Sequence, residues 1–149
     1  MRDGAGGEYV LKMVKADGRD AKARAAAALY RYNVEKTGID DRTPIGAEIC
    51  DLSGRCVGGL WGRTELGLLF LDMFFLPERL RGRALGGRLL EAVETEAKRR
   101  GCRRAVVETS SFQAPGFYLH HGYEEFGRVE FTCKGHARVF LRKDLAEDA

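Results

Sequence analysis

No apolar run in the sequence reaches the length of a membrane span, and residues 1–4 do not resemble the start of a signal peptide. Charge is nearly balanced, because 25 lysines and arginines stand against 22 aspartates and glutamates. The basic residues gather in two short clusters rather than along one stripe, which is not the pattern of a nucleic-acid-binding surface. We therefore expect a cytoplasmic protein that binds neither nucleic acid nor membrane.

Cysteine is scarce, and its spacing carries no metal signature. The four cysteines, which form no C-x-x-C pair, are Cys50, Cys56, Cys102 and Cys133. Without that spacing a structural metal site is not expected. In a reducing compartment the default state of such cysteines is the free thiol. The sequence therefore predicts four free thiols and no bound metal.

The length and composition are those of one globular domain. The chain has 149 residues, of which 44% are hydrophobic and 32% charged, and neither an internal repeat nor a low-complexity linker interrupts it. These values are ordinary for a folded domain with a sizeable core. We expect residues 1–149 to form a single domain.

The most informative stretch reads as a strand, a basic glycine-rich loop and a helix. Leu68–Leu76 is apolar on both faces apart from Asp72, as a covered central strand would be, and Pro77 ends it. The loop Arg79–Gly87 holds three glycines and three arginines, and an amphipathic helix follows it up to Gly101. Glycines that free backbone N–H groups, together with a helix N-terminus, make an anion site. The pattern predicts a phosphate or pyrophosphate site.

Two nucleotide-binding motifs compete for this loop. A P-loop is excluded because the sequence has no Gly-Lys-Ser/Thr. A dinucleotide fingerprint is closer, since Gly82–Gly87 fits a degraded G-x-G-x-x-G and Glu108 follows about 20 residues later. However, a Rossmann loop turns directly off its strand, and about 40 residues after Glu108 are too few for its remaining βα units. A dinucleotide-binding protein remains the weaker alternative.

Two motifs together resemble the GNAT superfamily of N-acetyltransferases. Arg81-Gly82-Arg83-Ala84-Leu85-Gly86 is similar to the family signature R/Q-x-x-G-x-G/A. The segment from Ser111 to Tyr123 is similar to the family's N-x-x-A-x-x-[LF]-Y-x-x-x-G-[FY]. Ala84 replaces the middle glycine of the first motif, and Ser111 replaces the usual asparagine of the second. The resemblance spans Leu68 to about Leu145 and implies that the loop holds the pyrophosphate of acetyl-CoA.

The resemblance also implies the fold. We expect an α/β (α+β) architecture, in which a mixed, mostly antiparallel sheet of six or seven strands carries three or four helices, with a splayed parallel strand pair at its centre. The residue patterns predict the elements directly. Strands are expected at Tyr9–Val14, Ile45–Leu52, Cys56–Arg63, Leu68–Leu76, Arg104–Thr109, Tyr123–Phe131 and Ala137–Lys143, and further helices at Asp20–Lys36 and Gln113–His121.

The residues that contact acetyl-CoA follow from the resemblance. The pantetheine arm would lie along the edge of the Leu68–Leu76 strand, and the pyrophosphate would lie in the loop. The expected contacts are Phe74, Phe75, Leu76, Arg81, Gly82, Arg83, Ala84, Leu85, Gly86, Gly87, Ser111 and Tyr118.

Two residues are candidates for the chemistry of amine acetylation. The resemblance implies that Tyr118 protonates the leaving thiolate and that Asp72 handles the amine's proton or charge. Asp72 is the one charged residue of an apolar strand and is expected on the same face as Phe74, where burial would raise the pKa of its carboxyl. Alternatively, Asp72 is a paired structural acid.

The acceptor is not encoded in a motif. A small-molecule amine is the preferred interpretation, while a protein N-terminus or lysine stays open, as does a homodimer. The contrasting function is a non-catalytic regulator that binds acyl-CoA. The expected activity is that of an N-acetyltransferase that moves an acetyl group from acetyl-CoA to a primary amine by direct attack in a ternary complex.

Overall fold

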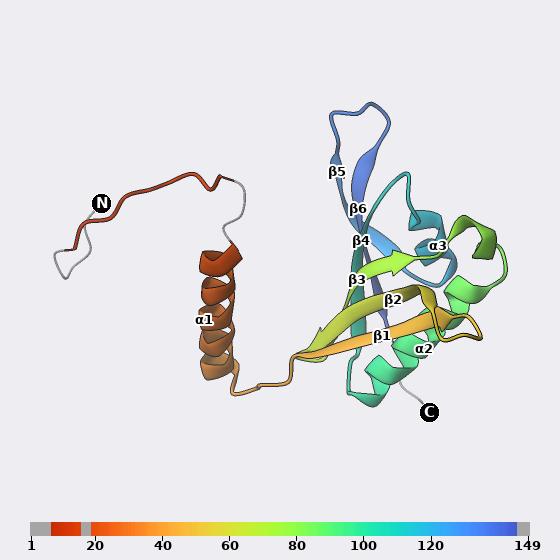
Figure 1. Cartoon of the computed structure of the whole chain (residues 1–149), viewed down its shortest axis with the longest axis horizontal. Coiled ribbons are helices and arrows are strands. Elements are labelled where there is room, and N and C mark those ends of the chain that lie inside the picture. The colour runs from red at the N-terminus through yellow and green to blue at the C-terminus, as the bar shows by residue number, and fades with distance from the viewer. Residues whose placement is uncertain (1–6, 16–18, 146–149) are drawn as a thin grey trace. The chain divides into compact units, whose positions relative to one another are not determined.

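The computed structural model of the chain describes residues 7–15 and 19–145 (Figure 1). The chain divides into two compact units, Met1–Asp40 and Asp41–Ala149. The expectation that residues 1–149 form one domain stays a prediction. No helix among the described residues is both long and apolar enough to cross a membrane.

The first unit contains the helix α1, which runs over Arg19–Thr37 and matches the predicted Asp20–Lys36 within one residue at each end. It ends at Gly38, whose φ of 72° is left-handed backbone that glycine adopts without strain. The strand predicted at Tyr9–Val14 is wrong, because residues 9–14 form no strand. Alternating apolar residues favour a strand, but a strand also needs a ladder of hydrogen bonds to a partner.

The second unit contains a six-stranded sheet, two α-helices and one short 3-10 helix (Figure 1). Its elements are β1 (Thr43–Cys50), β2 (Cys56–Glu65), β3 (Leu68–Phe75), η1 (Glu78–Leu80), α2 (Leu85–Arg99), β4 (Arg104–Ser110), α3 (Pro115–His120), β5 (Glu124–Glu130) and β6 (Ala137–Asp144). These bounds confirm the predicted elements from the first hairpin onward, apart from one or two residues at most ends and a shorter α3.

The strands lie in the order β1-β2-β3-β4-β6-β5. All neighbouring strands of the described sheet are antiparallel except β3 and β4, which are parallel because α2 connects them. This arrangement confirms the mixed, mostly antiparallel sheet. It also removes the dinucleotide alternative, since after β4 the chain returns as an antiparallel hairpin instead of further parallel βα units.

The parallel pair separates after a short ladder. β3 and β4 pair over four positions, from Leu68 with Arg104 to Leu71 with Val107. Beyond Leu71 the edge of β3 that faces β4 is released from the ladder, although β3 continues to Phe75. This is the splayed parallel pair that the family resemblance implies, and we call the opening the fork.

A β-bulge lies where the fork opens. Trp61 of β2 pairs with Met73, but the next residue, Gly62, pairs with Leu71, so β3 holds Asp72 as an extra residue. An extra residue shifts the in-and-out alternation of the strand by one position. The expectation that Asp72 and Phe74 share a face assumed an uninterrupted alternation, and the bulge makes it wrong.

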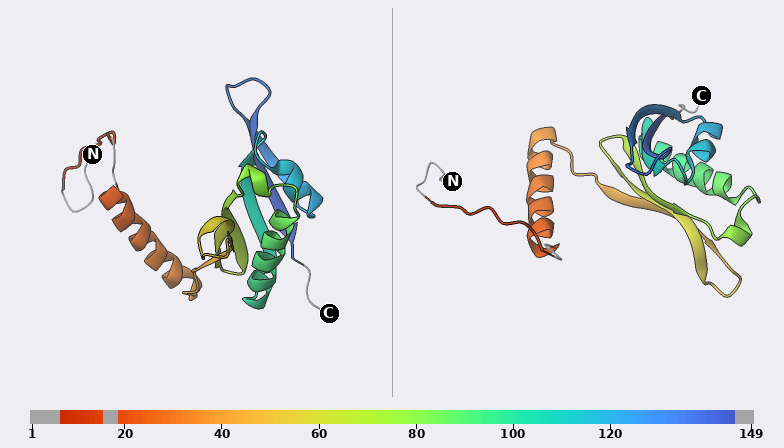
Figure 2. Two further views of the ribbon diagram at one scale, coloured as in Figure 1. Left: turned by 45° about the vertical axis from the view of Figure 1, so that its right-hand side comes forward. Right: turned by 90° about the horizontal axis from the view of Figure 1, so that it is seen from above.

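The core lies between the sheet and the two helices that follow it. In both views of Figure 2, α2 and α3 lie on the same side of the sheet. The apolar stripe of α2, formed by Leu89, Leu90, Val93 and Ala97, packs against buried residues of the central strands. This packing fixes the N-terminus of α2 relative to the end of β3.

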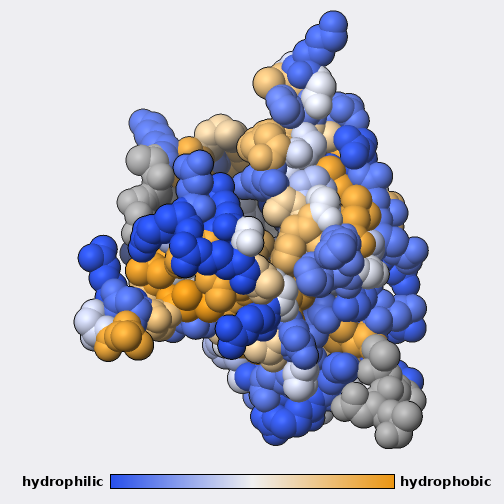
Figure 3. Space-filling model, turned by 90° about the vertical axis from the view of Figure 1, so that its right-hand side faces the viewer, coloured by the Kyte–Doolittle hydropathy of each residue, from blue (hydrophilic) through white to orange (hydrophobic). Residues whose placement is uncertain are grey.

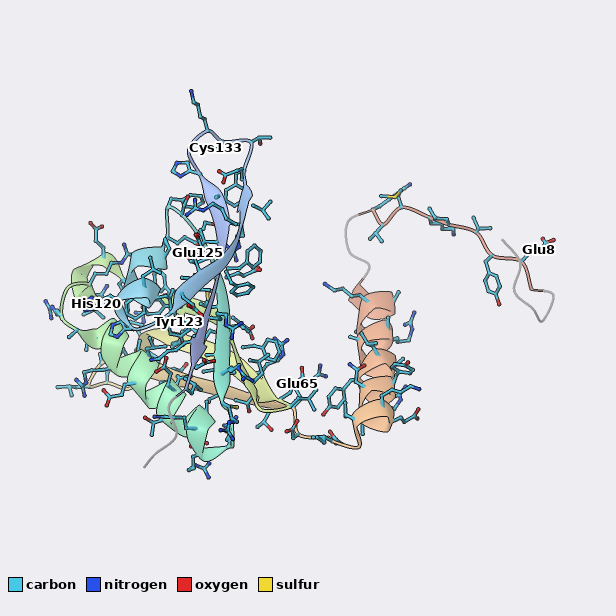
Figure 4. All side chains as sticks on the ribbon, turned by 180° about the vertical axis from the view of Figure 1, so that it is seen from behind. Glu8, Glu65, His120, Tyr123, Glu125 and Cys133 are labelled. Carbon is cyan, nitrogen blue, oxygen red and sulfur yellow. A yellow bond between two sulfur atoms is a disulfide. The ribbon has the colours of Figure 1, made fainter. Side chains whose placement is uncertain are left out.

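The cysteine prediction is half wrong. Cys50 and Cys56 form a disulfide that closes the β1–β2 hairpin, while Cys102 and Cys133 are free thiols. Cys133 lies in the tip of the β5–β6 hairpin (Figure 4). The two bonded cysteines are cross-strand partners at the end of the β1–β2 ladder, so the hairpin itself brings their side chains together.

A buried polar network joins α2, β6 and the segment after α3. The hydroxyl of Tyr123 donates to Glu94 Oε2 at 2.7 Å, and Lys143 Nζ lies 2.9 Å from Glu94 Oε1. Glu94 is 9% exposed and Tyr123 3%. Figure 4 labels Tyr123 beside α2. Because both oxygens of this buried carboxylate are bonded, the network ties three elements together without leaving an unpaired charge.

Lys143→Met should lower the free energy of unfolding by about 3 kcal/mol. The substitution leaves the Glu94 carboxylate buried without its cation, and the partial exposure of Lys143 keeps the cost at the lower end for a broken buried pair. Chemical denaturation measures the change. Arg99→Met is the matched control, because its ion pair with Glu96 is at the surface and its loss should change stability little. Equal stability of the two variants would contradict a structural role for the network.

Candidate functional site

A cavity of about 870 Å³ occupies the fork. Its lining includes the end of β3, the loop before α2, the first turn of α2, the middle of β4 and the segment from Phe112 to His121. Figure 3 views the molecule from the side that carries α2 and α3, where hydrophobic and hydrophilic residues both reach the surface. The cavity is large enough for a cofactor-sized ligand.

The loop before α2 presents backbone N–H groups. Gly82 and Ala84 both have left-handed backbone, with φ of 77° and 62°. The first intrahelical bond of α2 runs from the Arg88 N–H to the Ala84 C=O, at 3.2 Å. The N–H groups of the first three helical residues, 85–87, therefore have no partner within the helix, and they lie at its positive dipole end. This is the anion-binding geometry that the sequence predicted.

The three arginines of the loop are placed differently. Arg81 lines the cavity and donates from Nε to the Leu76 C=O at 3.0 Å, which ties the loop to the end of β3. Its terminal guanidinium nitrogens are not used in that bond. Arg79 and Arg83 are exposed and are not among the residues that line the cavity. The structure therefore brings only Arg81 into the candidate site.

The two glycines of the first helical turn make room for rings. A Cβ on Gly86 would lie 3.1 Å from the Phe74 ring and 3.3 Å from the Phe117 ring. A Cβ on Gly87 would lie 3.1 Å from the ring of His121. Phe74 and Phe117 stack with centroids 4.9 Å apart. Small residues at these positions let α2 approach the aromatic wall of the cavity closely.

Tyr118 lies at the centre of that wall. Its side chain is 2% exposed, its ring contacts Phe74, Phe117 and Tyr123, and it lines the cavity. Within residues 7–15 and 19–145 no buried side-chain polar atom lacks a hydrogen-bond partner, and the Tyr118 hydroxyl, for which no bond to these residues is seen, is therefore open to the cavity. Burial raises the pKa of Tyr118 to about 12, so the phenol stays protonated at neutral pH. A protonated phenol whose O–H is open to a cavity can donate a hydrogen bond to a ligand there.

Phe74, Phe75 and Leu76 line the cavity beside the released edge of β3. Phe74 faces α2 and α3, as its stack on Phe117 shows, and Leu76 is buried at 7% exposure. Phe75 is 50% exposed. Among the described residues this stretch pairs with β2 on one edge, while the ladder to β4 on the other edge ends at Leu71, so backbone groups of the second edge can bond a ligand laid in the fork.

Asp72 lines the same cavity from the opposite face of the sheet. It bonds Arg63 at 3.3 Å, and Arg63 stacks on Phe70, which puts Asp72 on the Phe70 face rather than the Phe74 face. Its side chain is 52% exposed, so the expected burial is wrong. Asp72 is exposed because the bulge turns it to this face and because its partner Arg63 lies at the surface.

Glu108 of β4 lies on this second face too. Its neighbours Val107 and Thr109 point into the core, at 8% and 6% exposure, while the Glu108 side chain is 54% exposed. It lines the cavity and bonds Arg138 at 3.2 Å. Glu108 was considered as the acidic residue of a dinucleotide fingerprint, and the sheet topology excludes that fold. Residues on both faces of the sheet thus line one cavity, which passes through the fork.

Ser111 is turned away from the cavity lining. Its hydroxyl lies 3.3 Å from His136 Nδ1 and accepts the Ala137 N–H at 3.0 Å. Gln113 lines the cavity and accepts the Ser110 N–H at 2.8 Å. The structure thus uses Ser111 to fix the β5–β6 hairpin. The role of Ser111 in binding a cofactor stays a prediction, and Ser111 is not among the residues that line the cavity.

Sequence reasoning missed part of the lining. His120, the last residue of α3, and His121, which follows it, both line the cavity, and Figure 4 shows His120 on α3. Phe112, Gln113 and Arg138 were not named as site residues either. A signal existed for the first two, because they fall inside the second motif. No group of three or more metal-ligating side chains occurs in the described part of the chain.

Comparison with known proteins agrees with this geometry. Residues 12–123 match the model of the acetyltransferase (GNAT) family. The chain is 30% identical to acetyltransferase Atu2258 of Agrobacterium fabrum, over 89% of this chain and 98% of that protein. It is 40% identical to the blasticidin-S acetyltransferase of Streptomyces morookaense, over 64% of this chain and 71% of that protein.

A solved structure shows the same fold. The crystal structure of an Agrobacterium tumefaciens protein assigned as an acetyltransferase superposes with a TM-score of 0.82, at 30% identity, over 92% of this chain and 98% of that one. Fold and relatives define an acyltransferase enzyme. The chain belongs to the GNAT acetyltransferase family, which confirms the resemblance read from its two motifs.

Ala84→Gly should raise the free energy of unfolding by about 0.5–1 kcal/mol. Ala84, which replaces the middle glycine of the motif, has a φ of 62°, where a Cβ costs about 1–2 kcal/mol. Glycine removes that strain, but it also raises the conformational entropy of the unfolded chain, which offsets part of the stabilisation. Chemical denaturation measures the difference.

Ala92→Gly is the matched control for this prediction. Ala92 is exposed within α2, where the same substitution should lower stability by about 1 kcal/mol. The two variants therefore differ in sign although they make the same chemical change. A destabilised Ala84→Gly variant would show that the loop carries no strain at this residue.

Proposed function

We propose that this enzyme transfers the acetyl group of acetyl-CoA to the primary amine of a small molecule. One observation carries the proposal. One cavity passes through the fork, and its lining joins a helix N-terminus, the phenol of Tyr118 and a carboxylate on the far face. These are the groups that thioester aminolysis requires, namely an anchor for the cofactor, a donor for the leaving sulfur and a group that receives an amine.

The residues present fit acetyl-CoA. Three N–H groups at the start of α2 and the guanidinium of Arg81 suit a pyrophosphate. A Cβ at Gly82 would meet no atom within 4 Å, so the turn of the loop leaves open space there. The released edge of β3 offers backbone groups for the amides of a pantetheine arm. When bound, acetyl-CoA supplies an acyl group activated as a thioester.

The chain's part in the reaction is electrostatic. The amine nitrogen forms a bond to the thioester carbon, the C–S bond breaks, and the carbonyl oxygen carries negative charge in between. Backbone N–H groups around Phe74–Leu76 stabilise that oxygen. The proton lost by the amine passes to water or to Asp72, and the sulfur gains a proton or a hydrogen bond from Tyr118.

Tyr118 serves chiefly as a hydrogen-bond donor. Its pKa of about 12 exceeds a reference thiol pKa near 8.5, so full proton transfer to a thiolate costs about 5 kcal/mol in water terms. The same burial raises the pKa of a thiol in the cavity and reduces this cost. A phenol O–H held at the sulfur stabilises the developing charge before any transfer is complete.

Asp72 orients the amine. Arg63 engages its Oδ1, and the second oxygen has no partner within residues 7–15 and 19–145. A half-engaged carboxylate at the far mouth of the fork can accept a hydrogen bond from the incoming amine and aim its lone pair at the thioester. The relative from Streptomyces morookaense, named for acetylation of blasticidin-S, supports a small molecule as the acceptor.

Release of CoA thiol from acetyl-CoA, measured across a panel of primary amines, tests the proposed function. Tyr118→Phe should bind acetyl-CoA with nearly unchanged affinity and lower kcat by about 10²-fold, the lower end for a lost acid catalyst. Because the pKa of Tyr118 is about 12, the wild-type kcat should show no fall near pH 10, where an ordinary tyrosine ionises.

The control variant is Tyr123→Phe. It removes a buried phenol that bonds Glu94 instead of facing the cavity, so stability should fall while kcat holds. If Tyr118→Phe keeps the wild-type kcat, Tyr118 is a packing residue and solvent protonates the sulfur. If acetyl-CoA binds but no amine causes the release of CoA thiol, the proposed function fails, and the result favours a non-catalytic protein that binds acyl-CoA.

A further inference from the structure

We propose that the acceptor is a dication, in which a second positive group lies a few bonds from the amine that is acetylated, and that Glu108 recognises the second group. This inference rests on the proposed function and deepens it. It starts from the register of β3 and β4. The last pair of the ladder is Leu71 with Val107, so the next residues on the two strands are Asp72 and Glu108.

Two carboxylates thus stand on either side of the opening. Both point to the sheet face opposite α2, and both line the cavity. Neighbouring paired strands lie about 4.8 Å apart, and the fork widens from that value. Two ammonium groups separated by roughly 5–7 Å could therefore each meet one carboxylate.

Each carboxylate is held by an arginine on the neighbouring strand, with one oxygen engaged. Arg63 reaches Asp72 Oδ1, and Arg138 reaches Glu108 Oε1. Arg138 is itself fixed by the hydroxyl of Ser110 at 3.0 Å. Within residues 7–15 and 19–145 the second oxygen of each carboxylate has no partner. The arginines thus orient the two acids and leave an acceptor oxygen of each for a ligand.

A second observation concerns the rest of the cavity lining. Tyr118, which is 2% exposed, lines the same cavity from the side of α2 and α3. Three large apolar side chains that line the cavity are also exposed, namely Met73, Phe75 and Phe112, at 58%, 50% and 62%. Methylene groups between two cations would cover such side chains, so the lining suits an aliphatic spacer with charged ends.

The assignment of the two acids follows from their strands. Asp72 is on β3, two residues before Phe74, where backbone N–H groups would hold the thioester oxygen. It therefore receives the reacting amine. Glu108 is on the other side of the fork and receives the cation that does not react. Glu108 is accordingly a residue that determines specificity, while Asp72 acts on every acceptor.

The test compares two acceptors of matched length, 1,4-diaminobutane and 4-amino-1-butanol. Both have a primary amine on a four-carbon spacer, and the far end is a second primary amine in the diamine and an uncharged hydroxyl in the amino alcohol. Wild-type kcat/KM, measured by thiol release, should favour the diamine by at least about tenfold, which corresponds to 1.4 kcal/mol. Glu108→Gln should bring the ratio to within about twofold of unity.

Two further variants complete the design. Asp72→Asn should lower turnover of both acceptors and keep the ratio. Glu91→Gln, an exposed acid on α2 outside this cavity, should keep both the ratio and the rate. Calorimetry of the wild type with each amine in the presence of CoA gives a readout that does not depend on turnover or on the folding of a variant, and the diamine should bind more tightly.

The outcomes separate this inference from the proposed function. Equal kcat/KM for the two acceptors in the wild type, or a ratio that Glu108→Gln leaves unchanged, overturns the proposal that the acceptor is a dication recognised by Glu108. The proposed amine acetylation is not affected by either result. Equal affinity of the two amines in calorimetry also overturns it. If neither amine nor any other of the panel releases thiol, the proposed function fails and the inference fails with it.

Discussion

The early end of the β3–β4 ladder is the constraint on which the site depends. Four paired positions hold the two strands together, and then both continue with their facing edges released. Buried backbone groups that leave a ladder need other partners, so an open fork is stable only where solvent or a ligand supplies them. The bulge at Asp72 lies at this point, and it turns the end of β3 so that Phe74 meets α2 while Asp72 meets Arg63.

The elements around the fork keep it open. α2 packs its apolar stripe on the sheet, and its first turn approaches the rings of Phe74 and Phe117 through Gly86. Glu94 joins α2 to Tyr123 and Lys143, so the segment after Tyr118 is tied to both α2 and β6. The helix N-terminus, the phenol and the released strand edge are therefore held in one fixed arrangement, which is the preorganisation that transition-state stabilisation requires.

Much of this could be predicted from local patterns. Leu68–Leu76, the loop and the stripe of α2 are adjacent in sequence, so periodicity and glycine spacing were sufficient to predict the strand, loop and helix of the central unit. The anion site and the role of Tyr118 stay predictions, although the loop and Tyr118 line one cavity. The parts that failed depend on pairing between segments. The strand expected at Tyr9–Val14, the cysteines of the first hairpin and the face of Asp72 are set by partners that a single segment does not reveal.

Backbone amide hydrogen exchange with and without acetyl-CoA tests the central claim most directly. If the cofactor lies in the fork with its pyrophosphate at α2, exchange should slow at residues 74–76 and at residues 85–87, while the β5–β6 hairpin is unchanged. Gly86→Glu should abolish these changes, because its side chain would meet the Phe74 ring and place negative charge at the cradle. Protection that appears elsewhere, or that Gly86→Glu retains, would contradict a fork that binds acetyl-CoA.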